Sequence, residues 1–120
     1  MKSLLIVVKE EFLAKGIAIA LMDKFQSIHT TKNSFEAFDI VEKEKIDIII
    51  TEIVFDTIDS NAYLKKLIDK SKIGSSVLVL NDSSIILPKF NKQINVIIQQ
   101  RPISIKRIKK IIESLYEIIN

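Results

Sequence analysis

Residues 46–51 read IDIIIT, a segment that contains three consecutive isoleucines and is rich in β-branched side chains. A run of this length and composition is typical of a strand that is buried on both faces of a parallel sheet. The continuous apolar run SLLIVV occupies residues 3–8, and further strands are predicted at residues 26–29, 77–80 and 94–99. The sequence therefore predicts five short strands with room for a helix between successive pairs.

Apolar side chains recur at three- and four-residue spacings between the predicted strands, which is the periodicity of amphipathic helices. The first helix is predicted within residues 10–25, with an apolar face of Phe12, Leu13, Ile17, Ala20, Leu21 and Phe25. Ser104 is expected to cap the last helix. The apolar stripe of that helix consists of Ile105, Ile108, Ile111, Ile112, Leu115, Ile118 and Ile119.

Two further helices are predicted from their capping residues. Asn33 and Glu36 resemble a capping box at the start of the second helix. The apolar face of the second helix is expected to contain Phe35, Phe38 and Val41. Asp59 is expected to open a third helix, whose apolar residues are Tyr63, Leu64, Leu67 and Ile68.

Strands that alternate with helices predict an α/β fold with a parallel sheet and right-handed crossovers. Five such units in 120 residues fit a flavodoxin-like (βα)5 three-layer sandwich with strand order 2-1-3-4-5. The fourth helix, expected within residues 81–93, should be short or broken, because Pro88 removes a backbone donor and clashes with the preceding turn. Residues 1–120 are expected to form one domain, with no output domain after it.

The composition excludes several classes of protein. Apolar residues make up 48% and charged residues 28% of the chain, a balance typical of globular proteins rather than disordered ones. The absence of cysteine excludes disulfides, thiolate metal sites and cysteine nucleophiles. No apolar stretch approaches the length of a membrane span, so we expect a cytoplasmic protein without membrane contact. The net charge of +3 does not by itself indicate nucleic-acid binding.

Four segments, in this order, resemble the receiver domains of bacterial response regulators: MKSLLIVVKEEFLAKG at residues 1–16, IDIIITEIVFDTIDS at 46–60, SVLVLND at 76–82 and QRPIS at 100–104. The resemblance extends over essentially the whole chain. It implies a role in two-component signal transduction. It also implies a phosphorylation site that combines two acidic magnesium ligands, a phosphoacceptor aspartate, a serine or threonine switch residue and a lysine before proline.

The sequence departs from this pattern at the magnesium-binding positions. The acidic pair corresponds to Val8 and Lys9, although Glu10 places one carboxylate next to them. Magnesium requires oxygen ligands in near-octahedral geometry, and a lysine ammonium repels the ion. We therefore expect no magnesium binding and no other cofactor.

The remaining positions of the resemblance are also altered. Glu52 stands at the phosphoacceptor position, Asn81 at the hydroxyl switch position, and Arg101 at the lysine position, followed by Pro102. Ile98 stands at the aromatic switch position. The additional methylene of a glutamate moves its carboxylate by about 1.5 Å, and misplacement by about 1 Å can cost a hundredfold in rate. Glutamate also resembles a phosphorylated aspartate in reach and charge.

Two interpretations of the altered site remain open. In the first, Lys9, Asn81 and Arg101 converge on Glu52 and hold a locked state through internal pairing, since arginine can bind a carboxylate with two parallel bonds. In the second, the site has decayed and these residues have no role.

The sequence favours an atypical, phosphorylation-independent receiver-like protein that binds a partner and is not an enzyme. The partner surface is expected on the fourth helix, the fifth strand and the last helix, where another protein or a second copy would bind. One alternative is a receiver that is still phosphorylated on Glu52, with help from Glu10. A less favoured alternative is nucleic-acid binding through the basic residues of the last helix, which are Lys106, Arg107, Lys109 and Lys110.

Overall fold

The structure, a computed structural model, describes residues 2–53, 58–81 and 94–118. Its sheet contains five parallel strands in the order β2-β1-β3-β4-β5, as the sequence predicts. The strands are β1 (Ser3–Val7), β2 (Ser27–Thr31), β3 (Ile48–Glu52), β4 (Ser76–Asn81) and β5 (Asn95–Gln100). The two edge strands are β2 and β5.

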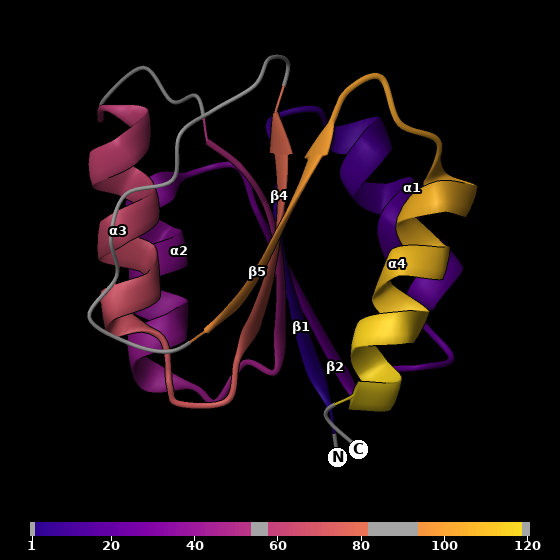
Figure 1. Ribbon diagram of the computed structural model, residues 1–120, viewed down its shortest axis with the longest axis horizontal. Helices are drawn as coiled ribbons and strands as arrows, with labels where there is room; N and C mark the ends of the chain where they lie inside the picture. The colour runs from indigo at the N-terminus through magenta and orange to yellow at the C-terminus, as the bar shows by residue number, and fades with distance from the viewer. Residues whose placement is uncertain (1, 54–57, 82–93, 119–120) are drawn as a thin grey trace.

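Helices cover both faces of this sheet (Figure 1). They are α1 (Glu11–Leu21), α2 (Ser34–Lys43), α3 (Ser60–Lys70) and α4 (Ile105–Ile118). The α2 and α3 helices lie on one face, and α1 and α4 lie on the other. The α4 helix is the predicted last helix, while residues 82–93, where a short or broken fourth helix is predicted, lie outside the described residues.

The central strands β1, β3 and β4 are apolar except at their ends, because both of their faces are buried. In β1, Leu5 and Val7 pack toward α2 and α3, whereas Leu4 and Ile6 pack toward α1 and α4. This alternation follows from the two-residue period of a strand. The side chains of β3 and β4 are likewise fully buried. The continuous apolar runs in the sequence therefore correspond to strands inside a three-layer sandwich.

Side-chain acceptors cap three of the helices. Asn33 Oδ1 accepts the backbone N–H groups of Phe35 and Glu36, at 2.8 and 3.1 Å. Asp59 accepts the N–H of Ala62, and Ser104 Oγ accepts the N–H of Arg107. In the predicted capping box, the Glu36 side chain accepts the backbone N–H of Asn33. In the structure, Thr31 Oγ1 accepts this N–H instead, at 3.1 Å.

Two predicted core residues are exposed, and these predictions are wrong. Phe12 is 84% exposed and Phe35 is 55% exposed. In α1 the buried side chains are Ala14, Ile17 and Leu21, which places Phe12 on the outer surface of the helix. In α2 the small residue Ala37 faces the sheet, and Phe35 instead contacts the edge of the Phe38 ring at a centroid distance of 6.1 Å. Helical periodicity did not distinguish the sheet-facing residues from their neighbours.

The last helix buries Ile108, Ile112 and Leu115, with Ile105 and Ile111 packed beside them. The Ile118 side chain and Ile119 belong to the predicted stripe but lie outside the described part of the chain. The α1 helix ends at Leu21, four residues before the predicted boundary. Phe25 is nevertheless buried after the helix, where its ring meets the Tyr116 ring edge-on at 5.5 Å.

Candidate functional site

The carboxyl ends of the strands bring the altered receiver positions together. Glu52 is the last residue of β3 and Asn81 is the last residue of β4, while Val8 follows β1 and Arg101 follows β5. All strands run in the same direction, so their carboxyl ends lie at one edge of the sheet. In open α/β sheets, this edge is where ligands bind.

Glu52 lies at the centre of this edge and is only 7% exposed. Its Oε1 atom accepts the backbone N–H of Lys9 at 2.6 Å. Its Oε2 atom accepts a hydrogen bond from the guanidinium of Arg101, with which it also forms an ion pair. Both carboxylate oxygens are therefore engaged by groups of the chain itself.

The backbone of Asn81 positions Arg101. The carbonyl of Asn81 accepts the N–H of Arg101 at 2.7 Å, which extends the contact between β4 and the segment after β5 by one residue. Asn81 is buried, at 4% exposure, and the peptide bond from Arg101 to Pro102 is cis. The guanidinium thus starts from an anchored backbone and reaches across the end of β4 to Glu52.

A buried hydroxyl pair lies directly behind Glu52. Thr51 Oγ1 and the Tyr63 hydroxyl are 2.7 Å apart, and Thr51 Oγ1 also donates to the Glu52 carbonyl at 2.6 Å. Burial raises the pKa of Tyr63; the nearby Glu52 carboxylate adds to this rise, and the hydrogen bond with Thr51 opposes it. Neither Thr51 nor Tyr63 is among the site residues predicted from the sequence. A signal for Thr51 is present in the sequence, because this hydroxyl residue directly precedes Glu52 and follows three isoleucines.

The three residues predicted to converge on Glu52 contribute differently. Arg101 reaches Glu52 with its side chain, and Lys9 reaches it through the backbone N–H, with its own side chain exposed. Asn81 acts on Arg101 through its backbone carbonyl. Ile98, at the aromatic switch position, is partly buried and packs against the core on the α2 and α3 side.

The magnesium-binding positions of the resemblance lie at this edge, on Val8 and Lys9, with Glu10 next to them. Val8 is a buried apolar side chain at 2% exposure, and Glu10 is exposed. Among the described residues, Glu52 supplies a carboxylate at the centre, and both of its oxygens are already in hydrogen bonds. Within residues 2–53, 58–81 and 94–118, no group of three or more histidine, cysteine, aspartate or glutamate side chains is arranged to hold a metal.

Helices in the described part of the chain are too short or too polar to cross a membrane. No protein-family model matches the sequence. One curated protein, the probable transcriptional regulator ycf29 of Porphyra purpurea, is 36% identical over 70 residues. This match covers 57% of the present chain and 34% of that protein, so the chain matches about a third of the length of its relative.

Solved structures resemble the whole chain. Chemotaxis protein CheY4 of Vibrio cholerae has a TM-score of 0.72 at 14% identity, over 96% of this chain and 98% of that one. The receiver domain of the hybrid histidine kinase CckA has a TM-score of 0.74 at 20% identity, over 95% and 98% of the two chains.

The beryllofluoride-activated NtrC4 receiver domain dimer has a TM-score of 0.74 at 18% identity, over 100% of each chain. The order of the strands, the helices on both faces and these likenesses together confirm, at the level of the fold, the resemblance seen in the sequence. The chain has the flavodoxin-like receiver fold of response regulators.

Proposed function

We propose that this chain is a phosphorylation-independent, receiver-like interaction module in cytoplasmic signalling, and that it acts by binding rather than by catalysis. The receiver fold supports a role in response-regulator signalling. The observation that carries the proposal is the internal pairing of Glu52, whose two carboxylate oxygens are held by the Lys9 N–H and the Arg101 guanidinium.

This pairing opposes phosphorylation for two reasons. A carboxylate that attacks phosphorus must present a free oxygen to the incoming group, in line with the leaving group. Both oxygens of Glu52 are already engaged, and the side chain is almost fully buried. The developing charge on a transferred phosphoryl group also needs cations around it. Here the Arg101 guanidinium is already neutralised by Glu52 itself.

The same contacts support the locked state over simple decay of the site. Glu52, Arg101 and the Lys9 N–H belong to three separate strand ends, and their hydrogen bonds tie these ends together. In the locked state, Glu52 takes the place of a phosphorylated aspartate, and Arg101 holds its carboxylate permanently. A single conformation is thereby favoured without a phosphate signal.

The test combines a binding assay and a mass measurement on the full chain. Magnesium with beryllofluoride, and separately acetyl phosphate, are added while amide chemical shifts and intact mass are recorded. We expect no saturable shifts near Glu52 and no added phosphate mass. The double variant Glu52→Asp with Arg101→Lys provides a comparison with a more receiver-like pair. Saturable shifts around Glu52 in the natural chain, together with a phosphate-sized mass increase, would contradict the proposal.

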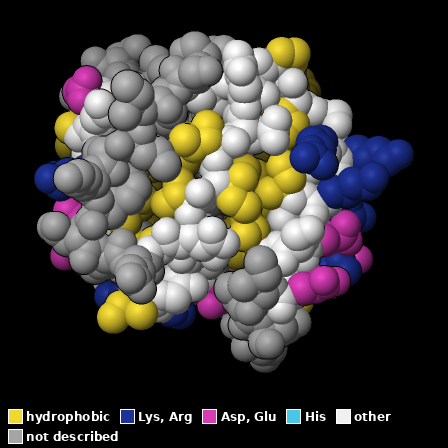
Figure 2. Space-filling view, viewed as in Figure 1, with side chains coloured by type: hydrophobic (Ala, Val, Ile, Leu, Met, Phe, Trp, Pro, Cys, Tyr) yellow, Lys and Arg dark blue, Asp and Glu magenta, His cyan; other side chains and the backbone are white. Residues whose placement is uncertain are grey.

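We propose a second copy of the chain as one occupant of the predicted partner surface. The structure describes β5 and α4 of this surface, and a groove of about 270 Å³ runs between them, lined by apolar Ile97 and Ile111 and by exposed Arg107 and Lys110. Figure 2 shows apolar side chains gathered on this face, with basic side chains beside them. Exposed apolar patches with a polar rim are typical of protein interfaces.

The charges of α4 favour a copy that packs antiparallel. Arg107 and Lys110 lie in its first half, and Glu113 and Glu117 lie in its second half. This order opposes the helix dipole, which favours acidic residues near the amino end. Antiparallel packing about a two-fold axis would set the basic half of one helix against the acidic half of the other.

Charge reversal tests this arrangement. Light scattering at several protein concentrations should show a dimer for the natural chain, a monomer for Arg107→Glu, and a dimer again for Arg107→Glu combined with Glu117→Arg. Lys65→Glu, on the exposed surface of α3, is the matched control and should leave the dimer unchanged. A natural chain that remains monomeric at high concentration would refute self-association without bearing on the Glu52 pairing.

A further inference from the structure

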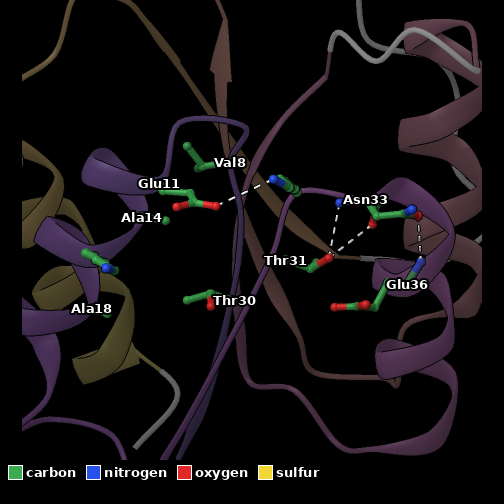
Figure 3. Close-up of a pocket in the computed structure, with 10 residues that line it drawn as sticks. Val8, Glu11, Ala14, Ala18, Thr30, Thr31, Asn33 and Glu36 are labelled. Carbon is green, nitrogen blue, oxygen red and sulfur yellow. Dashed lines mark hydrogen bonds and ion pairs between the residues drawn. The ribbon is translucent and has the colours of Figure 1, made fainter.

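A cavity of about 710 Å³ lies between α1 and the edge strand β2, away from the Glu52 pair (Figure 3). Its walls are one side of α1, the end of β2 and the first turn of α2. This volume falls within the range of about 300 to 1,000 Å³ that is typical of small-molecule sites. Its position beside the carboxyl ends of β1 and β2 is also one at which α/β folds bind ligands.

Small side chains on α1 leave this space open. Ala14 and Ala18 are four residues apart, so they lie on the same side of the helix, and both line the cavity. Val8 adds a third apolar side chain from the end of β1. These residues provide a compact apolar surface against which the body of a ligand can pack.

Several polar groups of the cavity are already used to hold its walls. Thr31 Oγ1 accepts the Asn33 N–H, and the Asn33 side chain caps α2. The Lys32 ammonium meets the Glu11 carboxylate at 3.5 Å, which links the β2 end to α1 across the cavity (Figure 3). These contacts connect the three elements that form the walls.

Two charged groups remain for a ligand. Lys15 comes from α1 and Glu36 comes from α2, so one cation and one anion line opposite walls. Within the described part of the chain, neither side chain takes part in an ion pair. In Figure 3 the Glu36 carboxylate points toward Thr30, another residue that lines the cavity.

We infer that this cavity binds a small zwitterion of the amino-acid or dipeptide class. The carboxylate of the ligand pairs with Lys15, its ammonium pairs with Glu36, and its body packs on Ala14 and Ala18. A purely anionic ligand would meet the Glu11 and Glu36 carboxylates, and a purely cationic one would meet both lysines. The two lysines and two glutamates of the lining therefore select against ligands of a single charge sign.

The test is a titration of the ¹⁵N-labelled full chain with the twenty glycyl dipeptides, each added separately. At least one should cause saturable amide shifts at Ala18, Thr31 and Lys32. The same dipeptide with an acetylated amino group, or as a methyl ester, should bind at least tenfold more weakly, because each blocked form lacks one of the two charges.

Variants test the location. Lys15→Met and Glu36→Gln should each weaken binding at least fivefold, and Ala18→Leu should abolish it by filling the cavity. Lys65→Met and Ala62→Leu, at exposed positions of α3, are the matched controls and should bind as the natural chain does. Circular dichroism checks that Ala18→Leu remains folded. The inference is wrong if no dipeptide binds, if blocked forms bind equally well, or if Lys15→Met and Glu36→Gln leave binding unchanged.

Discussion

The Arg101 guanidinium binds the Glu52 carboxylate across 49 residues of chain and across one intervening strand, since β4 lies between β3 and β5. The exposed fractions of the two side chains are 24% for Arg101 and 9% for Glu52. Charges this poorly exposed are screened less by salt than surface pairs are. The contact therefore connects the centre of the sheet to its edge strand at the end where receiver domains carry their signalling site.

Loss of Arg101 should destabilise the fold more than loss of the other arginine. Arg101→Met leaves the Glu52 carboxylate nearly buried without its cation, which should lower the free energy of unfolding by about 1.5 to 3 kcal/mol. Arg107→Met, on the exposed surface of α4, leaves no buried charge without its partner, so at protein concentrations too low for self-association it should change the free energy of unfolding by less than about 0.5 kcal/mol. Urea denaturation measures the free energy of unfolding of both variants. Glu52→Gln, alone and combined with Arg101→Met, completes a double-mutant cycle. A coupling energy near zero would show that the pair does not act as a unit.

Tyr63 should make the protein sensitive to alkaline pH. Burial raises the pKa of its phenol above the usual value of about 10, so the unfolded chain releases this proton first. The folded state therefore loses stability as the pH rises above about 10. Thermal unfolding of the natural chain and of Tyr63→Phe across pH 8 to 11 measures this loss.

At neutral pH, Tyr63→Phe should cost about 0.5 to 1.5 kcal/mol, because it removes the hydrogen bond to Thr51. Its stability should then fall less steeply in alkali than that of the natural chain. Parallel pH profiles for the two proteins would mean that other groups cause the alkaline loss.

Asn33 should contribute more to stability than Asn61, another asparagine near the start of a helix. Asn33→Ala removes the acceptor for two backbone N–H groups of α2 and should cost about 0.5 to 2 kcal/mol. Asn61→Ala, at an exposed position inside the first turn of α3, should cost less, because alanine is the better helix former there. Equal losses in chemical denaturation would argue against the capping role of Asn33.

The centre of the sheet should tolerate truncation poorly. Ile49 is fully buried in β3, and Ile49→Ala should lower the free energy of unfolding by about 2 to 5 kcal/mol through lost burial and a new cavity. Ile19, on the outer surface of α1, is 68% exposed. Ile19→Ala should therefore change stability by less than about 0.5 kcal/mol. Comparable losses for both variants would contradict the assignment of these surfaces.

The order of elements and the class of the fold followed from the sequence alone. Five segments of strand length, most of them apolar and separated by helical periodicity, allow few arrangements other than a parallel three-layer sandwich, because a strand buried on both faces needs helices on both sides. Local capping chemistry located the starts of α2, α3 and α4, since a cap involves only residues within one helical turn.

The sequence alone also placed Glu52, Asn81 and Arg101 at one edge of the sheet. The tertiary structure decided which atoms meet there. Lys9 meets Glu52 through its backbone N–H, and Thr51 and Tyr63 stand behind the site. It also placed Phe12 and Phe35 on the surface. Side-chain pairing and burial depend on how elements distant in sequence pack together, and the residue pattern of one element does not contain that information.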